Sequence, residues 1–96
     1  MRLTDEQIDR HLSALDGWQL AKDKCSIWQD FSFSDFYQTM AFVNAVAWIA
    51  HSQDHHPQME IGYRHCLVSY CTHSLGGLGE KDFICAKRID ALLTEY

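Results

Sequence analysis

The sequence predicts an α+β fold in which three helices cover one face of a four-stranded antiparallel sheet. Three segments carry apolar residues at the spacing of helices, and each gap between them holds two short runs of strand-forming residues. The expected order is therefore α-β-β-α-β-β-α. Two hairpins with helices between them are typical of an antiparallel sheet that is covered by helices on one side.

The first helix and the first hairpin come from the N-terminal part of the chain. Thr4 and Gln7 form a capping-box pattern, and apolar residues follow at helical spacing until the expected helix end near Asp16-Gly17. The runs WQLA and SIWQDFSF, separated by the polar KDK, are typical of two strands joined by a turn. We therefore expect a helix followed by a hairpin over residues 18–33.

A long apolar segment predicts the second helix, from Asp35 to His51, with Ser34 as its cap. Its apolar residues form two stripes, one of Phe36, Met40, Val43, Ala47 and Ala50 and one of Phe42, Val46 and Ile49. A helix buries one face against a sheet, and a small core cannot hide a second face. We therefore expect the second stripe, or its counterpart, to be exposed on a monomer and to form a symmetric contact between subunits.

The second hairpin and the third helix follow a proline turn. Pro57 disfavours helical backbone at His56, so the second helix must end before these residues. QMEIGYR alternates apolar and polar residues, and HCLVSYCT is rich in strand formers, which predicts two paired strands. SLGGLG then interrupts the chain, and apolar residues return at helical spacing from Glu80 to Tyr96.

Composition and charge exclude several classes of protein. A chain of 96 residues is expected to form a single domain, residues 1–96, and its net charge of −5 disfavours binding to nucleic acid. The N-terminus does not resemble a signal peptide, and no apolar run reaches the length of a membrane span, so we expect a soluble cytoplasmic protein without membrane contact. The four cysteines contain no C-x-x-C pair and are interpreted as reduced thiols.

Half of the six histidines lie in the stretch HSQDHHP, residues 51–57. His73 would return to this turn if its strand pairs with the strand that begins at Gln58. Adjacent histidines before a proline have no packing rationale, whereas imidazole exchanges protons near neutral pH. We therefore interpret His55, His56 and His73 as an acid–base group. The remaining histidines are interpreted as ordinary polar residues: His11, His51 and His65.

Three other kinds of chemistry are less favoured alternatives. His51 and His55 are four residues apart, as in zinc-binding helices, but the helix is expected to stop between them and no Glu follows His51. Cys71 shares a strand face with His73, yet nothing marks it as a nucleophilic thiolate. GGLGEKD could hold an anion at a helix start, although such loops commonly bind nothing. We expect no metal site.

The histidine pattern resembles the signature of the pterin-4a-carbinolamine dehydratases. That signature matches the order His51, His55, His56, Pro57, Tyr63, His73 and Asp82. Five segments resemble the family in order over nearly the whole chain: GWQL, FSFSDFYQTMAFV, DHHP, THS and GLGEKD. Three positions depart from better-known relatives. His51 stands where an acidic residue is frequent, Met59 stands where an aromatic residue follows the His-His-Pro turn, and Ser74 stands where a glutamate follows Thr-His. These departures bear on substrate affinity and proton relay more than on the reaction.

The resemblance implies that the protein converts 4a-hydroxytetrahydrobiopterin to quinonoid dihydropterin, as a hydro-lyase in tetrahydrobiopterin recycling beside an aromatic amino acid hydroxylase. It makes His55, His56 and His73 the catalytic group and requires no metal or redox cofactor. The implied substrate-binding residues are His51, Asp54, His55, His56, Pro57, Cys71, Thr72, His73, Ser74 and Asp82. Asp82 either orients a side chain or favours a helix N-terminus.

The same resemblance allows two alternative functions. The family also contains a non-catalytic dimerisation partner of a transcription factor, which would make this chain an interaction protein. A different pterin, for example in molybdopterin metabolism, is the other alternative. The resemblance further implies a homodimer or a homotetramer with helices at its centre.

Overall fold

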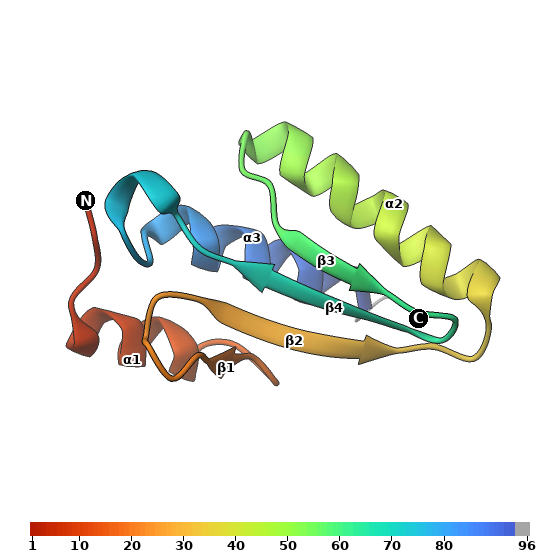
Figure 1. The fold of residues 1–96 in the computed structure, drawn as a ribbon, viewed down its shortest axis with the longest axis horizontal. Coiled ribbons are helices and arrows are strands. Elements are labelled where there is room, and N and C mark those ends of the chain that lie inside the picture. The colour runs from red at the N-terminus through yellow and green to blue at the C-terminus, as the bar shows by residue number, and fades with distance from the viewer. Residues whose placement is uncertain (94–96) are drawn as a thin grey trace.

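The computed structural model of the protein describes residues 1–93. Its elements are α1 (Asp5–Ser13), β1 (Gln19–Leu20), β2 (Ile27–Ser32), α2 (Phe36–Gln53), β3 (Gln58–Ile61), β4 (His65–Tyr70), the short 3-10 helix η1 (His73–Leu75) and α3 (Glu80–Leu93) (Figure 1). The predicted order of helices and strands is confirmed, and η1 is an addition inside the expected loop. The predicted continuation of the third helix to Tyr96 lies outside the described residues.

The sheet is antiparallel throughout, with the strand order β1-β2-β4-β3. Its centre is the pair β2 and β4, which runs from Ile27 opposite Tyr70 to Ser32 opposite His65. As expected, β4 also pairs with β3, and Gln58 lies opposite Ser69. The start of β3 and the end of β4 are therefore neighbours, so the His-His-Pro turn lies beside the segment that follows β4.

The helices cover one face of this sheet. Along the central strands β2 and β4, residues of the covered face alternate with exposed or half-buried ones, as a sheet with one buried face requires. The buried strand residues are Ile27, Phe31, Cys66, Val68 and Tyr70, and they join a core with Ile8 of α1, Val46 of α2 and Ile89 of α3. On the opposite face Trp28 and Asp30 are exposed. The predicted α+β architecture is confirmed.

Helix α2 begins and ends slightly differently from the prediction. Asp35, not Ser34, is the cap, because its carboxylate accepts a hydrogen bond from the Gln38 backbone N–H at 2.8 Å. The Ser34 backbone N–H instead donates to the Gln38 side chain at 3.1 Å. The helix continues to Gln53 and ends at Asp54, whose φ of 52° is left-handed. As predicted, it stops before the His-His-Pro turn.

The predicted exposed stripe of α2 is wrong. Phe42, Val46 and Ile49 are buried. The counterpart stripe is divided: Val43 and Ala50 are buried, whereas Phe36 and Ala47 are exposed. The physical reason is that α2 packs on both α3 and β4, so the interior takes up parts of both stripes. The outer face of α2, defined here as Tyr37, Ala41, Ala45 and Trp48, is apolar and largely exposed instead.

The N-terminal elements are shorter than expected. The capping box is confirmed, since the Thr4 hydroxyl accepts from the Gln7 backbone at 3.2 Å and the Gln7 side chain accepts from the Thr4 backbone at 2.9 Å. However, α1 already ends at Ser13, and β1 contains only Gln19 and Leu20.

Trp18 connects this region to α3, because its indole N–H donates to the Asp90 carboxylate at 2.8 Å.

Within residues 1–93, no helix is long and apolar enough to cross a membrane. The four cysteines are free thiols.

Candidate active site

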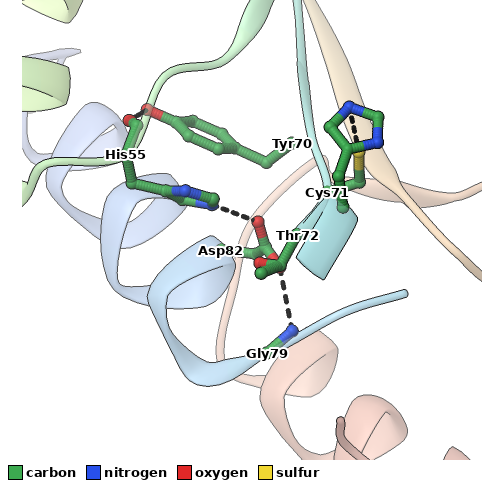
Figure 2. Close-up of polar contacts among 7 residues, drawn as sticks. His55, Tyr70, Cys71, Thr72, Gly79 and Asp82 are labelled. Atoms are coloured by element: carbon green, nitrogen blue, oxygen red, sulfur yellow. Dashed lines mark hydrogen bonds and ion pairs between the residues drawn. The ribbon is translucent and has the colours of Figure 1, made fainter. Parts of the chain in front are cut away.

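A fully buried carboxylate, Asp82 in the first turn of α3, forms the centre of the site (Figure 2). Its Oδ1 lies 2.5 Å from His55 Nε2, while its Oδ2 accepts from the Thr72 hydroxyl at 2.8 Å and from the Gly79 backbone N–H at 2.9 Å. A buried carboxylate is stable only when donors surround it. Asp82 therefore joins the turn before β3, the segment after β4 and the start of α3.

Both roles considered for Asp82 in the sequence are present in this arrangement. It orients the His55 imidazole, and it satisfies a backbone N–H at the start of a helix. The Gly79 amide belongs to the loop GGLGEKD, and its bond to Asp82 means that it is not available to bind an anion. A second amide, that of Gly77, donates to the Thr72 carbonyl at 3.4 Å. These contacts argue against an anion cradle in this loop.

His55 is the histidine that the structure holds most firmly. Its side chain is 13% exposed, and its backbone N–H donates to the Ala50 carbonyl at 3.0 Å, which turns the chain away from α2. An ionised carboxylate only accepts hydrogen bonds, so the bond to Asp82 places a proton on His55 Nε2. In this arrangement Nδ1 is the ring nitrogen that Asp82 does not bind.

Tyr70, the last residue of β4, lies against His55 (Figure 2). The two rings stack with their centroids 5.1 Å apart and their planes at 29°, and the Tyr70 hydroxyl donates to the His55 carbonyl at 3.3 Å. Burial, and then the neighbouring Cys85, raise the pKa of the Tyr70 hydroxyl above its usual range, so it stays a donor. Strand alternation indicates that Tyr70 is buried, but no sequence signal connects it to His55.

His73 and Cys71 form a second small group. His73 opens η1 and is exposed, and its Nε2 lies 3.7 Å from the Cys71 sulfur. Burial raises the pKa of the Cys71 thiol, and the Asp82 carboxylate raises it further. A raised pKa keeps the thiol protonated at neutral pH, which argues against the alternative of a nucleophilic cysteine. Ser74 beside His73 is exposed.

The remaining candidates lie in or before the His-His-Pro turn. His56 is exposed, Pro57 is half-buried, and Asp54 is the left-handed residue that ends α2. His51 is exposed on α2 and its ring lies 5.9 Å from that of Trp48. Asp82 therefore links His55 to Thr72 through side-chain hydrogen bonds. The remaining candidates take no part in those bonds.

The alternative of a zinc site at His51 and His55 has little geometric support. Because α2 ends at Gln53, His51 and His55 do not share one continuous helix face. In the described part of the chain, no group of three or more His, Cys, Asp or Glu residues is arranged to hold a metal ion.

A family model described as pterin 4 alpha carbinolamine dehydratase matches residues 1–92. The chain belongs to this family. It is 54% identical over 92 residues to a protein of Nitrosomonas eutropha, with 95% of this chain and 80% of the relative covered. It is 52% identical over 94 residues to a protein of Bdellovibrio bacteriovorus, with 94% and 77% covered. Both relatives carry the family name provisionally.

Solved structures of two similar proteins share the fold of this family member. One, described as a transcriptional coactivator/pterin dehydratase from Brucella melitensis, has a TM-score of 0.91 and 35% identity, and the match covers 95% of this chain and 97% of that one. The other is described as a pterin dehydratase-like protein that is a RuBisCO assembly factor in the alpha-carboxysome. It has a TM-score of 0.69 and 27% identity, with 80% and 89% covered.

Proposed function

We propose that this protein dehydrates 4a-hydroxytetrahydrobiopterin to quinonoid dihydropterin by histidine acid–base catalysis. The observation that carries the proposal is the hydrogen bond between His55 and the buried Asp82, which orients an imidazole between two chain segments. Those segments, 54–57 and 71–74, contain the catalytic histidines that the family resemblance implies. Membership in a dehydratase family supports the reaction class.

The proposed reaction needs one proton donor and one proton acceptor. The C4a–O bond breaks as an acid protonates the departing hydroxyl, and a base removes the N5 proton so that the C4a=N5 double bond forms. The products are water and quinonoid dihydropterin, and no electron is gained or lost, so the balance requires neither a metal nor a redox cofactor. Two or more imidazoles around one pterin are sufficient.

We assign the base to His55. When Nδ1 takes the N5 proton, the imidazolium that forms carries its positive charge beside the Asp82 carboxylate, which stabilises it. The acid is then His56 or His73, both of which are exposed to an incoming ligand. After water departs, the proton on His55 returns to the acid through solvent, and the site is restored.

Pterin recognition in this proposal uses the segment after β4. The backbone N–H of Thr72 donates to the Gly77 carbonyl at 2.9 Å, and the Thr72 carbonyl accepts from Leu75 and Gly77. The His73 carbonyl likewise accepts from the Gly76 N–H at 3.0 Å. Recognition of the amide-like edge of the pterin therefore falls to the backbone of Cys71 and Ser74 and to the N–H of His73. The other proposed binding residues remain those implied by the resemblance: His51, Asp54, His55, His56, Pro57, Thr72 and Asp82.

The proposal extends to the setting of the enzyme. We place it in the cytoplasm, where four free thiols suit a reducing compartment, and beside an aromatic amino acid hydroxylase that supplies its substrate. We also propose a homodimer or a homotetramer. The support for assembly is the outer face of α2, where Tyr37 is 82% and Trp48 is 67% exposed.

A coupled assay tests the proposed reaction. The purified protein is added to a hydroxylase turning over its tetrahydropterin, and the formation of quinonoid dihydropterin is followed by absorbance. We expect faster formation than in the uncatalysed control. This acceleration should be unchanged when the purified protein has been treated exhaustively with EDTA and the EDTA has been removed before the hydroxylase is added. The triple variant His55→Ala/His56→Ala/His73→Ala is the matched control and should not accelerate the reaction. A wild-type rate equal to the uncatalysed rate would refute the proposal, and loss of activity with EDTA that zinc restores would favour the metal reading.

An interaction role is the second candidate. It is favoured by the exposed aromatic residues on α2 and by the two solved structures, whose descriptions include a coactivator and an assembly factor. This role does not require dehydration. A chain that is folded by circular dichroism but inactive in the coupled assay with several hydroxylated pterins would favour it.

A further inference from the structure

We propose that Tyr70 is a positioning residue that fixes both the ring plane and the backbone of His55. Two separate contacts carry this inference. The Tyr70 ring stacks on the imidazole, with centroids 5.1 Å apart, and the Tyr70 hydroxyl donates to the His55 carbonyl at 3.3 Å. The first contact restricts rotation of the imidazole, and the second restricts the peptide group that leads to His56.

Tyr70 is suited to this role by its own rigidity. It is fully buried, and its strand β4 lies between β2 and β3 in the centre of the sheet. A side chain locked in this way cannot move aside when a neighbouring ring rotates. The position of the imidazole is therefore set by the sheet as well as by the turn that carries His55.

Tyr70 and Asp82 hold the imidazole from different directions. Asp82 binds one edge of the ring at Nε2, whereas Tyr70 covers one face, so the remaining edge with Nδ1 has a defined direction (Figure 2). Small displacements of a reacting group from its productive geometry lower the rate strongly. Because Tyr70 contacts no reacting atom in this arrangement, it acts on the reaction through His55.

The test compares Tyr70→Phe and Tyr70→Leu with a matched control, Phe31→Leu. Phe31 is also a buried aromatic residue on the same face of the sheet, but its ring contacts are with Trp18 and Phe42. The first readout is NMR of the ligand-free protein: nitrogen shifts of the His55 ring report its tautomer, and the carbon shift of its carbonyl reports the hydroxyl contact. The second readout is the separation of kcat from KM.

Each variant has its own expected result. Tyr70→Phe should move the His55 carbonyl signal, keep the Nε2–H tautomer and lower kcat about threefold, the size of one ordinary hydrogen bond. Tyr70→Leu should mix the two His55 tautomers and lower kcat about tenfold or more, with KM changed less than twofold. Phe31→Leu should lower the unfolding midpoint comparably while leaving the His55 signals and kcat as in the wild type.

Unchanged His55 signals in both Tyr70 variants would overturn the proposal. An equal shift of these signals in Phe31→Leu would also overturn it, because it would show general loosening rather than positioning. If Tyr70→Leu does not fold, Tyr70→Phe decides through the carbonyl signal alone. Only the kinetic readout rests on the proposed function: Tyr70-dependent His55 signals in a protein without dehydratase activity would contradict that function and leave the positioning role intact.

Discussion

His55 and Asp82, 27 residues apart in the chain, meet at 2.5 Å between Nε2 and Oδ1. This contact connects the turn before β3 to the first turn of α3, and the carboxylate that makes it is fully buried. The same residue pair therefore contributes to the stability of the fold and to the orientation of the proposed catalytic base. Variants at these positions should separate the two contributions.

Asp82→Asn should lower both activity and stability. Three donors converge on the two carboxylate oxygens, so the amide nitrogen of Asn would face a donor and leave it without an acceptor. We expect the dehydration rate to fall about 10²-fold and the free energy of unfolding to fall by about 1–3 kcal/mol. Steady-state kinetics and urea denaturation measure the two effects. Asp90→Asn is the control, since its oxygen can still accept from Trp18, and a full rate in Asp82→Asn would contradict the proposed role.

The three proposed catalytic histidines should differ in their effect on stability. Replacement of His55, His56 or His73 by Ala should slow dehydration about 10²-fold or more in each case. Only His55→Ala should lower the unfolding midpoint, because it removes a partner from the buried Asp82, whereas His56 and His73 are exposed. His65→Ala, on the exposed sheet face beside Asp30, is the control for activity. Equal stability of all three variants would argue against the importance of the buried pair.

Assembly should depend on Trp48 rather than on Val46. Trp48→Glu places a charge on the exposed outer face of α2 and should shift the protein toward smaller species in light scattering at micromolar concentration. Val46→Glu should unfold the chain instead, because Val46 is fully buried and an unpaired charge is costly in a core. A wild-type protein that is a stable monomer at these concentrations would refute the proposed assembly.

Alkaline pH should destabilise the fold through Cys66. Burial, and then the Asp30 carboxylate, raise the pKa of the Cys66 thiol from 9.0 to about 11. The stabilisation that the protonated Cys66 thiol gives the fold is complete below pH 9. It is lost as pH rises toward 11, because the thiol of the unfolded chain ionises first and this favours unfolding. At pH 10 the loss is on the order of 1 kcal/mol.

Urea denaturation at pH 8 and pH 10 measures this effect. Cys66→Ala should show a smaller decrease in unfolding free energy between the two pH values than the wild type does. Cys25→Ala, at a less buried thiol, should behave as the wild type. An identical decrease in all three proteins would exclude Cys66 as the source.

Local patterns in the sequence determined the elements of this protein and two of their boundaries. The capping box at Thr4 and the helix end before Pro57 are properties of a few consecutive residues, and both were predictable for that reason. Periodicity likewise predicted three helices and two hairpins, because each element buries one side. The histidines of the turn were recognisable as candidates because their clustering is visible in the chain itself.

The tertiary structure alone decided which side chains meet. Periodicity showed two stripes on α2 but not that α3 and β4 would share them, so the exposed face was predicted wrongly. In the same way, Asp82 was a candidate of undecided role and Tyr70 an ordinary strand residue until the pairing of β3 with β4 set the turn against both. Contacts between distant residues depend on strand register and helix packing. These are properties of the whole folded chain, and no short stretch of sequence contains them.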